Sequence, residues 1–281
     1  MAGRKTAFTT LLALLIPIAN ASASVSPAAE ELFTVFGLAV TNSIVTSWVV
    51  SILLIVGIRW MVGTPKLVPS RGQAVIEGFL SFVRDMTGPI VGPKAFKTAL
   101  PFILGFFFFI LIQNWSGLIP GVGSLGMGVE GTDGHFQVTQ PFIRPANADW
   151  NGTIALAAVA MISWFWIVMK YEGPMLLLKD LFGNKADKKE VGGGMWLALW
   201  PIFLMVGLIE VISICIRPFT LSVRLFGNIF GGENLLHQTN FFPLFYFLEL
   251  MVGFVQPLVF ILLFSVYIGL ICNHGDGEEH H

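Results

Sequence analysis

A stripe of polar residues inside an apolar segment is the feature of this sequence that could carry chemistry. Most side chains between residues 211 and 232 are apolar, yet Arg224 lies near the middle of this stretch. On a helix of about 100° per residue, several polar residues fall within about 40° of Arg224: Glu210, Ser213, Arg217, Thr220 and Asn228. An arginine at the bilayer centre costs about 2.5–3.5 kcal/mol on insertion scales, so it must face a partner or water. We therefore interpret Arg224 as an ion-pathway residue.

Two more acidic residues accompany this stripe. Glu233 follows Arg224 by nine residues, which places it on the opposite helical face and about 13 Å farther along the axis. The next apolar segment carries Glu249 and Gln256, which a spacing of seven places within about 20° of each other. An antiparallel hairpin turning near residue 240 would bring Glu233 close to Glu249, and Arg224 close to Gln256. Such a carboxylate pair could exchange protons.

Arginine keeps its proton at all physiological pH values, so Arg224 repels cations and cannot relay protons. The pattern therefore predicts two ion-access routes separated by a fixed positive barrier. The candidate proton-translocation residues are Arg224, Glu233, Glu249, Gln256, Asn228 and Glu210. The alternative is that these side chains only bridge helices through hydrogen bonds.

The composition is that of an integral membrane protein. The chain has 281 residues, of which 55% are hydrophobic and 12% charged, with a mean hydropathy of +0.77. A soluble domain carries about 25% charged residues. Cys215 and Cys272 both lie in apolar runs without metal-ligand or redox spacing, so we expect small buried hydrophobes. We expect no metal, no cofactor and no nucleic-acid partner.

Uncharged stretches predict an all-α membrane protein with five embedded helices. Their expected bounds are about 36–58, 98–119, 150–170, 194–238 and 241–272. The fourth is about twice as long as the hydrocarbon layer is thick, so it must tilt steeply and form a long hairpin with the fifth. An amphipathic pattern between Gln73 and Met86 predicts a short interfacial helix.

Residues 1–23 resemble a cleavable signal peptide, which would leave a single membrane domain at 24–281. Arg4 and Lys5 precede a short apolar stretch and small-residue cleavage sites; an uncleaved anchor is the alternative. Lys and Arg are concentrated between residues 59 and 97 and between 170 and 189, whereas the intervening loop has only Arg144. The positive-inside rule then places the N-terminus outside and the C-terminus in the cytoplasm.

Taken together, these residues resemble subunit a of the F-type (rotary) ATP synthase membrane sector. The likeness covers nearly the whole chain after residue 23. It rests on Glu210, on Arg217-Pro-Phe-Thr-Leu-Ser-Val-Arg224-Leu-Phe-Gly-Asn228, on Gly232-Glu233 and on Phe247-Leu-Glu249 with Gln256. Asn114-Trp-Ser-Gly-Leu-Ile-Pro120 and the segment 144–151 support it.

The resemblance implies a non-catalytic stator subunit with two offset half-channels that pass protons to and from a rotating c-ring. Arg224 matches the residue that attracts the ring carboxylate and prevents a short circuit. Glu233 and Glu249 match the outer half-channel, and Glu210 matches a position near the cytoplasmic exit. Asn228 and Gln256 match polar neighbours of the arginine.

The implied partners are the c-ring, the peripheral-stalk b subunits, other membrane-sector subunits and the lipid bilayer. The implied location is a bacterial inner membrane, with a thylakoid-type membrane as the alternative. The coupling ion, proton or sodium, is chosen largely by the ring carboxylate on another chain.

The sequence departs from the family pattern at two places. Many relatives pair a glutamate with a histidine at the positions of Glu233 and Glu249, whereas here both are glutamate and His237 lies one turn farther on. Many bacterial members carry a carboxylate where this chain has Gly117. Asp149 either supplies acidity at that mouth or caps a helix.

Two other functions fit an intramembrane arginine. A secondary transporter or channel could use Arg224 to bind an anionic substrate, but it would be expected to show an internal repeat, and none is visible. A passive assembly anchor would tolerate joint replacement of Arg224 and Gln256. The sequence has no Gly-x-x-x-x-Gly-Lys-Ser/Thr loop for a nucleotide.

Overall fold

The computed structural model describes residues 29, 31–35, 37–119, 126–130, 136–141, 143–175, 193–238 and 242–272. The predicted signal peptide lies outside these residues. In chain order the elements are β1 (Glu31–Val35), β2 (Leu38–Thr41), α2 (Asn42–Val62), α3 (Arg71–Val91), α4 (Pro93–Gly117), β3 (Gly126–Glu130), β4 (Phe136–Pro141), the 3-10 turn η3 (Ala146–Ala148), α5 (Trp150–Tyr171), α8 (Gly193–Gln238) and α9 (Phe242–Cys272).

Five helices of the described chain are long and apolar enough to cross a membrane: α2, α4, α5, α8 and α9. This confirms the predicted all-α class, and four of the five predicted spans begin and end within about five residues of the observed helices. The predicted start of the first span, near residue 36, was wrong. The helix begins at Asn42 because the residues before it form the antiparallel hairpin β1–β2, with Gly37 at φ 80° in its turn.

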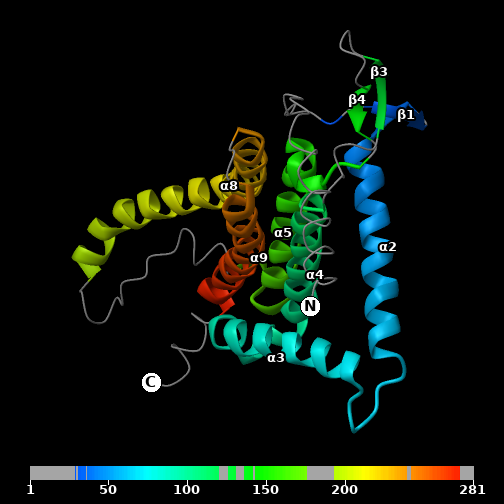
Figure 1. Cartoon of the computed structure of the whole chain (residues 1–281). Helices are drawn as coiled ribbons and strands as arrows, with labels where there is room; N and C mark the ends of the chain where they lie inside the picture. The colour runs from blue at the N-terminus through cyan, green and yellow to red at the C-terminus, as the bar shows by residue number, and fades with distance from the viewer. Residues whose placement is uncertain are drawn as a thin grey trace.

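A second hairpin, β3–β4, lies in the predicted outer loop, where the sequence had suggested no strands. In Figure 1 both hairpins lie at one end of α2, and α3 lies at its other end. The basic residues where α2 joins α3, which are Arg59, Lys66 and Arg71, therefore lie on the side opposite the hairpins. This separation agrees with the charge asymmetry of the sequence.

The amphipathic helix predicted between Gln73 and Met86 is confirmed as the longer helix α3. The Ser70 side chain caps it by accepting a hydrogen bond from the Gln73 backbone N–H at 3.3 Å. Val83 and Val91 are fully buried on its inner face, whereas Val75 is 51% exposed. The helix therefore packs its apolar stripe onto the bundle.

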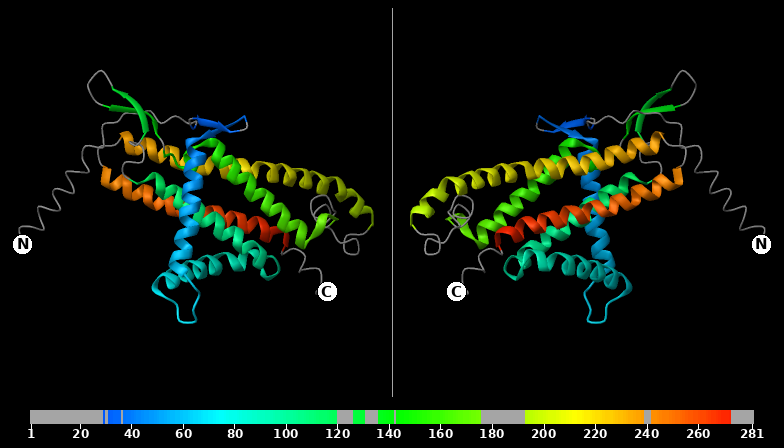
Figure 2. Two further views of the ribbon diagram at one scale, coloured as in Figure 1. Left: turned by 90° about the vertical axis from the view of Figure 1, so that its right-hand side faces the viewer. Right: turned by 90° about the vertical axis from the view of Figure 1, so that its left-hand side faces the viewer.

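The last two helices form the predicted long hairpin. Helix α8 has 46 residues, which at 1.5 Å per residue corresponds to about 70 Å, more than twice the hydrocarbon thickness of a bilayer. Figure 2 shows both α8 and α9 nearly perpendicular to α2, and Figure 1 shows the N-terminal half of α8 curving away from α9. If α2 crosses a membrane along its normal, both helices of the hairpin are steeply tilted.

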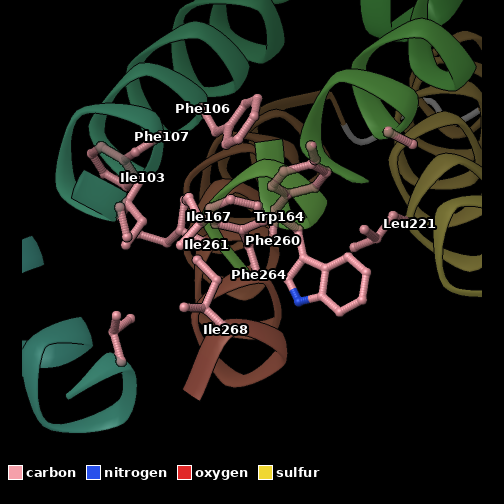
Figure 3. Packing of buried hydrophobic residues seen from close by; sticks show 14 of the residues in the cluster. Ile103, Phe106, Phe107, Trp164, Ile167, Leu221, Phe260, Ile261, Phe264 and Ile268 are labelled. Atoms are coloured by element: carbon pink, nitrogen blue, oxygen red, sulfur yellow. The ribbon is translucent and has the colours of Figure 1, made fainter. Parts of the chain in front are cut away.

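The hydrophobic core lies where α4, α5 and α9 meet (Figure 3). The Phe106 ring packs edge-on against Phe260 and Phe264, with centroids 5.6 and 5.3 Å apart. Helix α8 contributes little to this core. Its buried residues, among those whose side chains are described, are Gly207, Leu221, Ser222, Leu225 and Gly232. Cys215 on this helix is exposed, contrary to expectation, because it lies on the side facing away from the core.

Candidate functional site: a polar crossing between two tilted helices

Arg224 lies on α8 beside the residues that attach this helix to the bundle. Leu221 and Leu225 are buried at 2% and 0% exposure, whereas Arg224 itself is half-buried. Among the residues that the structure describes, no hydrogen bond, ion pair or ring contact to the Arg224 guanidinium is found. A permanent cation in an apolar hairpin needs a partner or water, so the Arg224 guanidinium is open to water or to a group outside the described residues.

One turn farther along α8, Asn228 is bound to α9. Its amide nitrogen donates to Gln256 Oε1 at 2.5 Å. Gln256 is 4% exposed, and its Nε2 is buried without a hydrogen-bond partner in the described chain. The sequence had placed Arg224 next to Gln256, but the hydrogen bond comes from Asn228. Asn228 lies one helical turn closer to the hairpin turn than Arg224.

Glu249 on α9 approaches the backbone of α8. It is 6% exposed, and a Cβ atom added at Gly232 would overlap its carboxylate group. Gly232 therefore provides the space that lets a buried carboxylate lie against the helix. Glu233 follows in the same helix, but its side chain lies outside the described part of the structure. The predicted pairing of Glu233 with Glu249 therefore also lies outside the described residues, as does the side chain of His237.

Glu210 lies on α8 in the other direction from Arg224. It is half-buried, and the spacing of fourteen residues corresponds to about 21 Å along the helix. No hydrogen bond or ion pair to its carboxylate is found within the described residues. The structure thus brings Asn228 and Gln256 together, and Glu249 against Gly232, but keeps Glu210 apart from both.

A buried hydroxyl pair fixes α8 to α5 next to Arg224. Thr153 Oγ1 and Ser222 Oγ are 3.1 Å apart, and both residues are fully buried. Trp150 adds edge-on ring contacts to Phe219 and Phe226, at 6.1 and 5.4 Å between centroids. These contacts hold the middle of α8 against the bundle.

An amide chain that the sequence did not predict lies between α4, η3 and α9. Asn147 Nδ2 donates to Asn114 Oδ1 at 2.7 Å, and Asn114 Nδ2 donates to the Gly253 carbonyl oxygen at 3.0 Å. Pro257 lacks an N–H group and so cannot bond the Gly253 carbonyl within α9. Asn114 satisfies that carbonyl instead.

Asp149 has the capping role that the sequence left as one of two alternatives. Its carboxylate accepts from the Asn151 backbone N–H at 3.3 Å at the start of α5, and from Ser43 Oγ at 2.9 Å. It is 2% exposed. The departure at Gly117 also has a packing reason, because a Cβ atom there would lie 2.8 Å from Pro145 Cγ. This arrangement leaves no room for a carboxylate at that position.

The polar groups of this region could pass or orient a small ion, but they are not grouped like metal ligands. In the described ranges no cluster of three His, Cys, Asp or Glu residues is found. The fold and this crossing define a multi-pass membrane protein that carries ionisable side chains inside its spanning hairpin, the class that moves ions across bilayers.

The chain belongs to the ATP synthase A chain family, whose model matches residues 44–269. It is 30% identical over 273 residues to "ATP synthase subunit a, sodium ion specific" of Propionigenium modestum, covering 94% of this chain and 84% of that protein. It is 26% identical over 259 residues to "ATP synthase subunit a" of Anaeromyxobacter sp. (strain Fw109-5), covering 85% of this chain. Of that second relative the chain spans 56%. Family membership gives the chain a membrane-sector role in ion translocation.

Proposed function

We propose that this chain is the stator subunit that conducts the coupling ion in the membrane sector of an ATP synthase. It provides two offset half-channels that deliver ions to, and receive them from, carboxylates on a rotating c-ring. The single observation that carries this proposal is the half-buried Arg224 guanidinium, which has no partner among the described residues. The scarcity of buried residues along α8 supports a large partner on that side.

The proposed role of Arg224 follows from its charge. It attracts a deprotonated ring carboxylate, and because it does not release its own proton it prevents protons from passing straight between the two half-channels. Glu249 and Glu233 belong to the outer route, and Glu210 to the cytoplasmic route. Asn228 and Gln256 orient the groups around the arginine through their hydrogen bond.

The energy available per ion requires a repeating mechanism. One elementary charge that crosses 100 mV releases about 2.3 kcal/mol. Synthesis of one ATP therefore needs several crossings, which a ring of identical carboxylates provides step by step. In this proposal the chain itself catalyses no bond formation, and the peripheral-stalk b subunits hold it against the torque of the ring.

The proposed setting is a bacterial inner membrane, with the N-terminus outside and the C-terminus in the cytoplasm. The basic end of the bundle, where α2 joins α3, would then face the cytoplasm. The two hairpins would lie on the outer side.

The test is Arg224→Ala in the complete ATP synthase, reconstituted in vesicles. Ion-driven ATP synthesis and passive proton leak are measured together. We expect synthesis to be lost while the subunit composition of the complex is unchanged. Arg59→Ala is the matched control, because Arg59 is an exposed arginine at the end of α2, and it should leave synthesis normal. Normal coupled synthesis with Arg224→Ala would contradict the proposed function.

A further inference from the structure

Arg217 is a second permanent cation in the membrane hairpin, and helical spacing alone does not distinguish it from Arg224. The spacing of seven residues puts the two side chains within about 20° of one another and about 10 Å apart along α8. Both residues are half-buried. On spacing alone, either could face a partner outside the chain.

The structure gives the two arginines different surroundings. The Arg217 guanidinium carbon lies 4.4 Å from the centroid of the Tyr267 ring and 6.0 Å from that of Trp164. Both distances lie within the range of a cation–π contact. Arg224 has no such ring contact among the described residues. Arg217 is therefore turned toward α5 and α9.

The two rings are themselves fixed. Trp164 is 3% exposed, and its indole N–H donates to the Tyr267 carbonyl oxygen at 2.8 Å. Trp164 belongs to α5 and Tyr267 to α9. A single guanidinium thus joins α8 to two other helices, and we call Arg217, Trp164 and Tyr267 the aromatic clamp.

The position of the clamp along α8 gives it a mechanical role. Pro218 follows Arg217 directly and removes one N–H from the helix ladder, which weakens the helix at that point. Between residues 199 and 216, no described side chain of α8 makes a hydrogen bond or ring contact to another element. Among the described side chains, the clamp is therefore the last polar attachment of α8 before its long exposed arm, and it lies about two turns from Arg224.

We propose that Arg217 is a positioning residue: its aromatic clamp fixes the rotation of α8 about its axis, and so the direction in which Arg224 faces the ring. This inference rests on the proposed function of Arg224. It also explains why one cation of the stripe is left for the ring carboxylate while the other is held within the chain.

The test uses the complete ATP synthase in vesicles, with ion-driven ATP synthesis and proton leak as readouts. We expect Tyr267→Leu, which keeps both arginines but removes the ring, to lower synthesis. The expected loss is about 2- to 30-fold, which is the cation–π range converted at 1.36 kcal/mol per tenfold. Arg217→Gln should cause a similar loss, and the double variant should be no worse than either single one.

Two conservative variants separate positioning from general damage. Tyr267→Phe keeps the ring, and Arg217→Lys keeps a cation that can lie over it, so both should retain most of the synthesis. Lys170→Gln is the matched control, because Lys170 lies 5.2 Å from the Trp166 ring in a cation–π contact that involves none of the three clamp residues. It should leave synthesis unchanged.

The results distinguish this inference from the proposed function. If Tyr267→Leu retains full synthesis, or if its loss adds to that of Arg217→Gln, the clamp has no positioning role, whatever Arg224→Ala does. If Arg224→Ala retains synthesis, the proposed function fails. A loss with Tyr267→Leu that Tyr267→Phe does not share supports the clamp.

Discussion

Replacement of Asn228 by leucine tests whether the polar crossing stabilises the hairpin. Leucine has the same number of side-chain heavy atoms and branches at the same carbon, but it cannot donate to Gln256 Oε1, which the Asn228 amide reaches at 2.5 Å. Gln256 is 4% exposed, and its Nε2 already lacks a partner in the described chain. The substitution would leave both ends of the Gln256 amide without a hydrogen bond from a described residue.

The expected cost follows from two ranges. Side-chain hydrogen bonds between membrane helices are worth about 0.6 kcal/mol on average and about 1.7 at most. A buried polar group that loses its partner costs about 1–3 kcal/mol. We expect Asn228→Leu to lower the free energy of unfolding by about 1–2 kcal/mol. Asn228→Leu with Gln256→Leu should cost less than the sum of the single changes, because neither polar group then remains.

The assay is unfolding of the chain in mixed micelles by titration with sodium dodecyl sulfate, followed through the fluorescence of its 8 tryptophans. Asn234→Leu is the matched control on the same helix, because Asn234 donates to the Phe230 carbonyl oxygen within α8 at 2.7 Å. The control should change stability less than Asn228→Leu. Single effects of Asn228→Leu and Gln256→Leu that add within about 0.5 kcal/mol would refute the reasoning.

Two glycine substitutions give further predictions. Gly152→Ala should lower the free energy of unfolding in the same titration by about 1–3 kcal/mol, because its Cβ would lie 2.5 Å from a backbone carbonyl oxygen of η3. A Cβ atom at Gly105 would meet no other atom within 4 Å, so Gly105→Ala should leave the free energy of unfolding unchanged or raise it by up to about 1 kcal/mol. Equal losses of stability with Gly152→Ala and Gly105→Ala would contradict the prediction. Gly232→Ala should displace the Glu249 carboxylate and lower ion-driven ATP synthesis about tenfold, the equivalent of about 1.4 kcal/mol. Gly231→Ala is the control and should leave ATP synthesis unchanged, because a Cβ atom there would have no neighbour within 4 Å. An equal loss of synthesis with both substitutions would show that displacement of the Glu249 carboxylate is not the cause.

The spans were predictable because the bilayer fixes the length of an apolar helix. Lys170 ends an apolar run, and helix α5 ends at Tyr171, one residue past the predicted position. The fourth segment could be recognised as tilted for the same reason, since its length exceeds any perpendicular crossing. The hairpins β1–β2 and β3–β4 were missed because their strands are only four to six residues long, and even the alternating run 136–139 in β4 is too short to predict a strand by itself.

Contacts between helices were harder to predict than positions on a single helix. Helical spacing correctly placed Asn228 near Arg224, but it says nothing about how far one helix slides along another. The hydrogen bond between Asn228 and Gln256 was therefore not predicted. The same limit applies to Arg217, whose neighbours Trp164 and Tyr267 come from segments about 50 residues away in either direction.

Asn114 and Pro257 have a relationship that bears on how this sequence can change over time. Pro257 leaves the Gly253 carbonyl without a donor in α9, and Asn114 supplies the donor from another helix. While Pro257 is present, loss of Asn114 leaves a buried carbonyl unsatisfied. If position 257 has an N–H group, the Gly253 carbonyl can accept a hydrogen bond within α9, and the hydrogen bond from Asn114 is no longer needed. The order of the two substitutions therefore decides whether the intermediate sequence contains an unsatisfied buried carbonyl. Whether α4 tolerates the loss of Asn114 depends on whether Pro257 in α9 has already been replaced.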